Sequence, residues 1–291
     1  MKRFLFLLVA LGLYAITASA QTEKNYIFRV ATGNITYTEP QEKKTTVGSV
    51  LGDLVKAAAG SNTEQHPEFA DNVRSAISGA IGSARRLRVV DTPLLPEDLE
   101  EDEAAMTFDG SIGSISCTSQ NITTKDSKGV EHKSIQYRST ITATINLKSV
   151  RTGQIVKTIT IGTGEYDYNW IETPEKAIGN AIAKMQAYIT NELNLSYPMY
   201  ASIVEGNLAK KDKQKEVYID LGALDGAFKG MTFNVYTVFT VAGKEAKKEI
   251  GRLRITEVMG DDISLCKVTR GGVDIKASID AGATLLITST N

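Results

Sequence analysis

The sequence predicts an α+β protein in which a domain of helices and strands is followed by a small all-β domain. Over 139–161, apolar and polar residues alternate with a period of two, which is typical of half-buried β-strands. Over 177–193, apolar residues recur with helical spacing and form a single face. After residue 198, short apolar runs separated by glycines replace the helical pattern. Helices are therefore expected only in the first domain.

The alternating segment predicts an antiparallel hairpin between strands at 139–147 and 155–161. Gly153 lies in the short connection between them, where a turn residue is required. A third strand is expected over 106–117, joined to this pair through the polar segment 118–133. The three strands would place one face on a core and the other in water.

Three helices are predicted in the same domain. The first covers 47–59 and is stopped by Gly60-Ser61-Asn62, and the second covers 67–82 with Pro67 at its start. The third begins at Thr173-Pro174-Glu175, where threonine can cap, proline is tolerated at the first position and glutamate complements the helix dipole. Its single apolar face must lie against the sheet.

Weaker signals surround these helices. A first strand is expected over 26–30, with 34–38 as its continuation or neighbour, and a buried strand over 87–90. The acidic stretch 91–103 has two prolines and no periodicity, so an exposed loop is expected. A calcium loop needs a turn glycine among its oxygen ligands, and none is present there.

The C-terminal domain begins near Pro198 and the lysine-rich segment 210–215. We expect that segment to be a solvated hairpin tip rather than a site for an anionic polymer. Short strands separated by glycines indicate a small barrel or sandwich. They are predicted at 217–221, 231–240, 249–258, 263–269 and 284–288.

The N-terminal twenty residues have the features of a cleavable signal peptide. Lys2 and Arg3 precede an apolar stretch, and Ala18-Ser19-Ala20 matches a signal peptidase site. Cleavage after Ala20 would leave Gln21 at the N-terminus. Because no cysteine follows this site, no N-terminal lipid anchor is expected, and no later stretch is apolar enough for an integral span. We therefore expect an exported protein, periplasmic or outer-membrane-associated or extracellular, that is not a lipoprotein.

Composition argues against several functional classes. Removing Lys2 and Arg3 from the 33 basic residues leaves a near balance with the 34 acidic ones, which disfavours nucleic acid as a partner. His66 and His132 lie in polar segments without the companions that a catalytic triad or metal site needs. Cys117 and Cys266 lie in strand-like patterns and are expected to be buried free thiols. A non-catalytic protein with no cofactor or metal is expected.

Four segments occur in a fixed order: 69–74, the R-L-R-V-V-D element at 86–91, 108–112 and the R-T-G-Q-I element at 151–155. Taken together over about 26–195, they resemble the CsgG-like envelope family, which includes the curli secretion channel and LpoB-type activators of penicillin-binding proteins. The segments 220–226, 229–236 and 250–255 resemble the small barrel that ends the flagellar assembly protein FlgT. The resemblance implies a mostly antiparallel α/β sandwich (CsgG/TolB-N-like) over 21–197 and an SH3-like barrel over 198–291.

The expected function is that of an envelope accessory or scaffold protein that binds a protein or a cell-wall glycan, with self-association left open. Tyr166, Tyr168 and Trp170 are the candidate binding residues, because aromatic side chains in loops often form contact hot spots. They can equally fold back over the core. The alternative function is a subunit of a CsgG-type outer-membrane secretion channel, in which 106–117 and 135–147 would face lipid. These strands carry polar outward faces with Tyr137 as their one interfacial aromatic, so a core sheet is favoured.

Overall fold

The computed structural model describes residues 25, 27–38, 61–100, 103–162 and 170–290. The chain divides into two compact units, and each is described by itself. The first unit is Phe28–Leu193, and the second contains residues from Asn194 onward together with Asn25 and Ile27. The division therefore falls before residue 197, where the sequence predicts the end of the first domain. Helices and strands are both present, as expected of an α+β protein.

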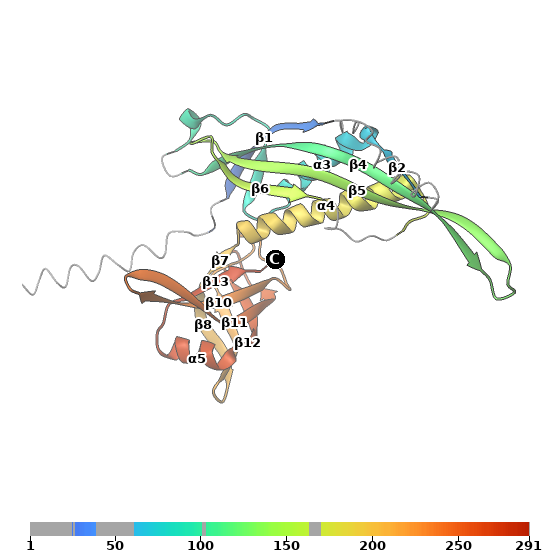
Figure 1. The fold of residues 1–291 in the computed structure, drawn as a ribbon. Helices are drawn as coiled ribbons and strands as arrows, with labels where there is room; N and C mark the ends of the chain where they lie inside the picture. The colour runs from blue at the N-terminus through green and yellow to red at the C-terminus, as the bar shows by residue number, and fades with distance from the viewer. Residues whose placement is uncertain (1–24, 26, 39–60, 101–102, 163–169, 291) are drawn as a thin grey trace, which may run out of the picture. The chain divides into compact units, whose positions relative to one another are not determined.

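A six-stranded mixed sheet organises the first unit (Figure 1). Its main path runs β3-β1-β4-β5-β6, and β2 pairs with β4 beside that path. β1 is parallel to both β3 and β4, whereas the β2–β4, β4–β5 and β5–β6 pairs are antiparallel. The strands are β1 Phe28–Tyr37, β2 Ser61–Gln65, β3 Leu87–Val90, β4 Ala105–Lys125, β5 Glu131–Ser149 and β6 Ile155–Ile161.

The strand predictions for this unit are largely confirmed. The two segments predicted at 26–30 and 34–38 belong to the single strand β1, which is interrupted by a register shift between Thr32 and Ile35. The 139–147 and 155–161 segments form the expected hairpin, with Ala143 opposite Ile161 and Gly153 at φ +67° in the turn. The described part of the acidic loop, residues 91–100 and 103, is mostly exposed, with a short 3-10 turn η2 Pro96–Asp98. Leu94 anchors it against Ala31 and Ala105.

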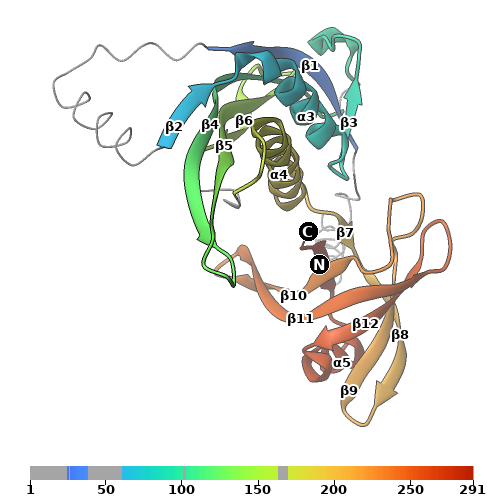
Figure 2. The ribbon, with the colours of Figure 1, turned by 90° about the vertical axis from the view of Figure 1, so that its right-hand side faces the viewer.

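Two helices pack on one face of the sheet. Figure 2 shows β4, β5 and β6 curving around α4 (Pro174–Ser196), with α3 (Ala70–Gly82) on the same side. The predicted cap of α4 is present, because Oγ1 of Thr173 accepts a hydrogen bond from the Lys176 amide at 3.3 Å. α3 follows a 3-10 turn, η1 Pro67–Phe69. The apolar faces are buried as predicted, including Val73, Ile77, Ile81, Ile178, Met185, Ile189 and Leu193.

The segment 118–133 is not a simple polar connection. β4 and β5 continue as paired strands out to the Lys125–Glu131 pair, so most of the segment is extended hairpin. The alternation rule misses these strands because both of their faces are exposed to water, and no apolar face marks their period.

The second unit is a seven-stranded sheet that returns to its starting point. Its order is β7-β13-β10-β11-β12-β9-β8. Only Ser202 separates β7 from β8, so one run of chain pairs with β13 at one end and with β9 at the other. The strands are β7 Tyr200–Ala201, β8 Ile203–Lys210, β9 Lys213–Ile219, β10 Thr232–Val241, β11 Lys244–Val258, β12 Ser264–Arg270 and β13 Leu285–Ser289. The lysine-rich segment is a hairpin tip between β8 and β9, as predicted.

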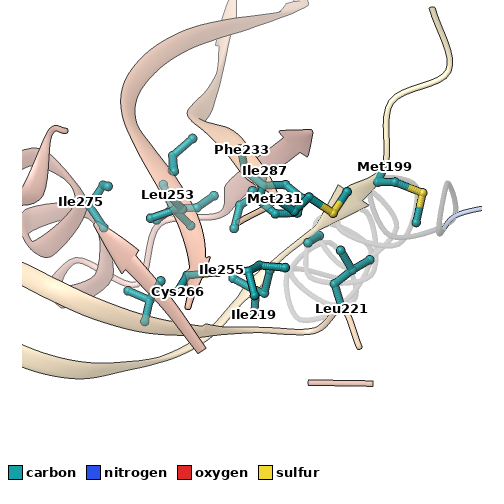
Figure 3. Close-up of a cluster of buried hydrophobic side chains, with 14 residues drawn as sticks. Met199, Ile219, Leu221, Met231, Phe233, Leu253, Ile255, Cys266, Ile275 and Ile287 are labelled. Atoms are coloured by element: carbon teal, nitrogen blue, oxygen red, sulfur yellow. The ribbon is translucent and has the colours of Figure 1, made fainter. Parts of the chain in front are cut away.

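The second unit is not all-β, which corrects the prediction. A nine-residue helix, α5 Gly272–Asp280, packs against β9 and β11. Figure 3 shows Ile275 of this helix entering the core beside Leu253. The helix has no recognisable stripe because Ile275 is its only buried residue. One buried side chain defines no period.

Both cysteines are buried free thiols, as predicted. Burial raises the pKa of Cys117 to about 11 and that of Cys266 to about 12. Cys266 belongs to the core in Figure 3, with Ile255 and Ile219 on neighbouring strands. Thiols with pKa values this far above neutrality are poor nucleophiles. Neither is therefore a candidate for covalent catalysis.

Asn25 belongs to the second unit, although the sequence assigns it to the first domain. Its amide Nδ2 donates to the Tyr200 carbonyl at 3.0 Å, and its Oδ1 accepts from the Tyr200 amide at 2.9 Å. This reciprocal pair ties residue 25 to β7, 175 positions later. The predicted cleavage residues Ala20 and Gln21 and the predicted helix 47–59 lie outside the described residues.

Candidate functional site

The part of the β4–β5 hairpin formed by residues 121–135 is here called the arm. In Figure 1 the hairpin runs out beyond the other strands of the first unit. The neighbouring strand β2 pairs with β4 only up to Gln120, so beyond that point β4 and β5 pair with each other alone among the described residues. Nearly all arm residues are exposed, including Val130 and Ile135, whose side chains are 52% and 51% exposed.

The arm ends in a turn organised by one carboxylate. Oδ1 of Asp126 accepts hydrogen bonds from the amides of Lys128 at 2.8 Å and Val130 at 2.9 Å. The amide of Gly129, at φ +79°, donates to the Asp126 carbonyl at 3.0 Å. Oδ2 lies 3.4 Å from Nε2 of His132. Backbone hydrogen bonds, with a smaller contribution from His132, lower the pKa of Asp126.

We expect the arm tip to loosen in acid. A carboxyl group whose pKa is lowered in the folded turn stabilises that turn above its ordinary pKa, and this contribution is lost as the pH falls through the lowered value. The amides of Lys128 and Val130 should therefore lose hydrogen-exchange protection, corrected for intrinsic rates, below about pH 4. The Asp126→Ala variant should lack this protection at every pH. Unchanged protection of both amides in that variant would contradict the assignment.

Trp170 is held at the base of the hairpin. The Tyr137 amide donates to the Ile171 carbonyl at 2.7 Å, and the Ile171 amide donates back at 2.8 Å. This bridge continues the β6 side of the sheet and places the Trp170 ring 5.1 Å from Cζ of Arg138. A guanidinium at this distance over an indole is a cation–π contact. Trp170 is half-buried.

Trp170 is thus the one predicted binding residue that the structure describes. Tyr166 and Tyr168 lie outside the described residues. Sequence reasoning missed Arg138, its partner, because the two are neighbours only through the Tyr137–Ile171 bridge. It also missed the arm, for which the only signal was the unusual length of the polar segment between two strand patterns.

The histidines form small local pairs. Nδ1 of His66 lies 2.8 Å from Oε1 of Glu68, and this contact lowers the pKa of the Glu68 carboxyl. His132 contacts Asp126 at the arm tip. Over the described ranges, no three His, Cys, Asp or Glu side chains gather into a group that could hold a metal ion.

An open cavity of about 460 Å³ lies along β1 at residues 32–37. Its one charged lining residue is Arg74, whose Nε donates to the Ile35 carbonyl at 2.9 Å and whose guanidinium also pairs with Asp71. Arg74 therefore helps to fix the bulged part of β1 in place.

None of the helices in the described part of the chain combines the length and apolar character of a membrane span.

Comparisons with known proteins identify no family. No family model matches the sequence, and no curated protein matches it. Among solved structures, the chain is similar to the crystal structure of a neuraminyllactose-binding hemagglutinin homolog from Helicobacter pylori. The two are 14% identical, the match covers 59% of this chain and 86% of that chain, and the TM-score is 0.26. A likeness of this degree assigns neither a family nor a ligand.

Proposed function

We propose that this chain is an exported, non-catalytic accessory protein of the cell envelope that acts by binding other macromolecules, with the arm as a principal contact. The N-terminal charge, apolar stretch and Ala18-Ser19-Ala20 pattern support export. The two units would then be a CsgG-like scaffold and an SH3-like barrel. The closed pairing of the second unit supports the barrel assignment.

The arm is the observation that carries the proposal. An isolated two-stranded hairpin is marginally stable in water, so its own side chains contribute little to folding. Its residues are nevertheless paired without interruption from Asn121 to Lys125, and its turn is closed by several hydrogen bonds. A hairpin that is well formed and buries little of its own surface suits contact with a partner.

The side chains of the arm favour a binding function in water over the alternative of a membrane channel. A hairpin in lipid needs one continuous apolar face. Ile122 lies opposite Ser134 and Ile135 lies opposite Asn121, so the two isoleucines are on opposite faces of the arm. Lys125, Lys133 and Glu131 add charge along its length. These side chains fit an aqueous contact surface.

Removal of the arm should abolish partner capture and leave the fold intact. The variant replaces residues 121–135 with Asn-Gly, which closes a two-residue hairpin between the opposed residues Gln120 and Gln136. The tagged protein is crosslinked in intact envelopes of its own host, and the crosslinked species are compared with those of the unmodified chain. We expect the major crosslinked species to be lost, with the melting temperature within a few degrees of the parent value.

A change at another exposed hairpin tip is the control. Lys211→Asn with Asp212→Gly alters the turn between β8 and β9, and capture should persist. Unchanged capture by the arm-deleted variant would remove the arm from the contact. Recovery of the unmodified chain as a partner-free monomer with hydrolytic activity would overturn the proposed function itself.

A further inference from the structure

Four exposed cationic side chains lie together on the outer face of the second unit. Arg252 and Arg254 are on β11, and Lys267 and Arg270 are on β12. In the β11–β12 register Arg254 is directly opposite Lys267, and Arg252 is directly opposite Arg270. These four residues are called the basic quartet.

Only one of the four charges, that of Arg270, has an acidic partner among the described residues. Arg270 pairs with Glu249, and Nε of Arg252 donates to the neutral Oδ1 of Asn234 at 3.1 Å. Within the described residues, Arg254 and Lys267 make no ion pair. Like charges placed directly opposite each other on neighbouring strands destabilise a sheet. The pair is therefore a local cost to folding that a bound anion would relieve.

The acidic residue opposite Lys267 on its other side is engaged elsewhere. Glu216 of β9 lies opposite Lys267, and its Oε2 accepts a hydrogen bond from Nδ2 of Asn207 at 3.1 Å. It makes no ion pair with Lys267 in the described part of the chain. Two cations thus remain available to a ligand.

One of the arginines, Arg252, is held in place by a hydrogen bond before any ligand arrives. Asn234, which accepts from Arg252, also donates through Nδ2 to the Tyr236 hydroxyl at 3.3 Å. The guanidinium of Arg254 lies against Gly230, where an added Cβ would meet it at 3.5 Å. A guanidinium group that is restrained, as that of Arg252 is, loses less conformational entropy on binding an oxyanion in a bidentate manner.

We propose that the basic quartet binds the oxyanions of an acidic polysaccharide. Opposite β11, the face continues onto β10 with the neutral groups of Thr232, Asn234 and Tyr236, which can exchange hydrogen bonds with sugar hydroxyls. A membrane surface would require apolar side chains among the cations, and duplex nucleic acid would require a larger excess of positive charge. Acidic and basic residues are nearly balanced over 194–291.

This inference deepens the proposed envelope function by naming a ligand class for the second unit. It stands on residues separate from the arm. If partner capture is observed without polysaccharide binding, only the assignment of the basic quartet as a binding site is overturned. If polysaccharide binding is observed without partner capture, only the assignment of the arm as a contact is overturned.

Heparin, as a sulfated polysaccharide, and alginate, as a carboxylated one, are the probes for titration calorimetry on the full mature chain. We expect binding that weakens as salt is added, because a polyanion releases counterions when cations bind it. The double variant Arg254→Gln/Lys267→Gln should bind roughly tenfold or more weakly. The control Lys244→Gln/Lys248→Gln removes equal charge from exposed positions of β11 outside the quartet and should bind within about twofold of the parent.

A single charge reversal separates binding from stability. Arg254→Glu places a carboxylate opposite Lys267 on one side and opposite the neutral Thr232 on the other, so the melting temperature should rise while polysaccharide binding is lost. Equal losses in the double variant and in the lysine control would overturn the quartet as a site. So would parent-level binding by Arg254→Glu, or stronger parent binding to phosphatidylglycerol vesicles or duplex DNA than to either polysaccharide.

Discussion

Gly271→Ala should destabilise the second unit by more than about 2 kcal/mol, because two separate penalties meet at this position. Gly271 precedes α5 with φ 75° and ψ 24°, a left-handed conformation that residues with a side chain rarely adopt. A Cβ at this position would lie 1.8 Å from the Ile250 carbonyl oxygen and 2.7 Å from the Gly251 Cα. Both are backbone atoms of β11 and cannot move away without breaking strand pairing.

Gly282→Ala is the matched control at the other end of α5. Its φ is +64°, and an added Cβ would meet no atom within 4 Å. It should therefore show only the conformational penalty, about 1 kcal/mol. Differential scanning calorimetry of the full chain measures both variants. Equal decreases in stability for the two variants would mean that the close packing of α5 on β11 adds no penalty beyond the backbone conformation.

Ile145→Ala should lower the free energy of unfolding of the first unit by about 2–5 kcal/mol, the usual cost of deleting a fully buried isoleucine side chain to the β-carbon. Ile145 is fully buried on β5, between Gly110 of β4 and Ile159 of β6. The curved sheet and the helices enclose this position, so the cavity left behind cannot collapse freely. Trp170 is the only tryptophan and belongs to this unit, so its fluorescence follows the transition.

Ile135→Ala makes the same substitution on the same strand, in the arm. Its side chain is 51% exposed, and it lies opposite Asn121 beyond the covered part of the sheet. The expected change is below about 1 kcal/mol, the range of strand propensity alone. A loss comparable to that of Ile145→Ala would show that the arm packs on something that stabilises the fold, and would weaken its assignment as a free contact element.

Elements with one buried face were predictable from local pattern. The helical stripe of 177–193 and the alternation over 139–161 each report a single buried face, and both elements occur where they were expected. The arm, β8 and α5 were missed for the converse reason. Two exposed faces, or a single buried side chain, leave no period for a pattern to reveal.

The two candidate surfaces also combine features visible in the local sequence with features that depend on strand pairing. Trp170 stood out because tryptophan is rare and lies in a polar segment, but its contact with Arg138 depends on a backbone bridge between distant residues. Arg252 and Arg254 alternate visibly with the buried residues Leu253 and Ile255. Their juxtaposition with Lys267 and Arg270 depends on the β11–β12 register, including two register shifts that no local pattern encodes.

The sequence by itself determined which segments must bury an apolar face, that both cysteines are buried, and where the first unit's central hairpin turns. These follow from short-range periodicity and backbone preference. Tertiary structure alone decided that β4 and β5 extend past the sheet and that like charges face one another on the second unit. It also decided that α5, which Gly271 precedes, packs closely on β11 at Gly251. Such features arise from pairing across long stretches of chain, where register and close backbone approach are set by the whole packed core.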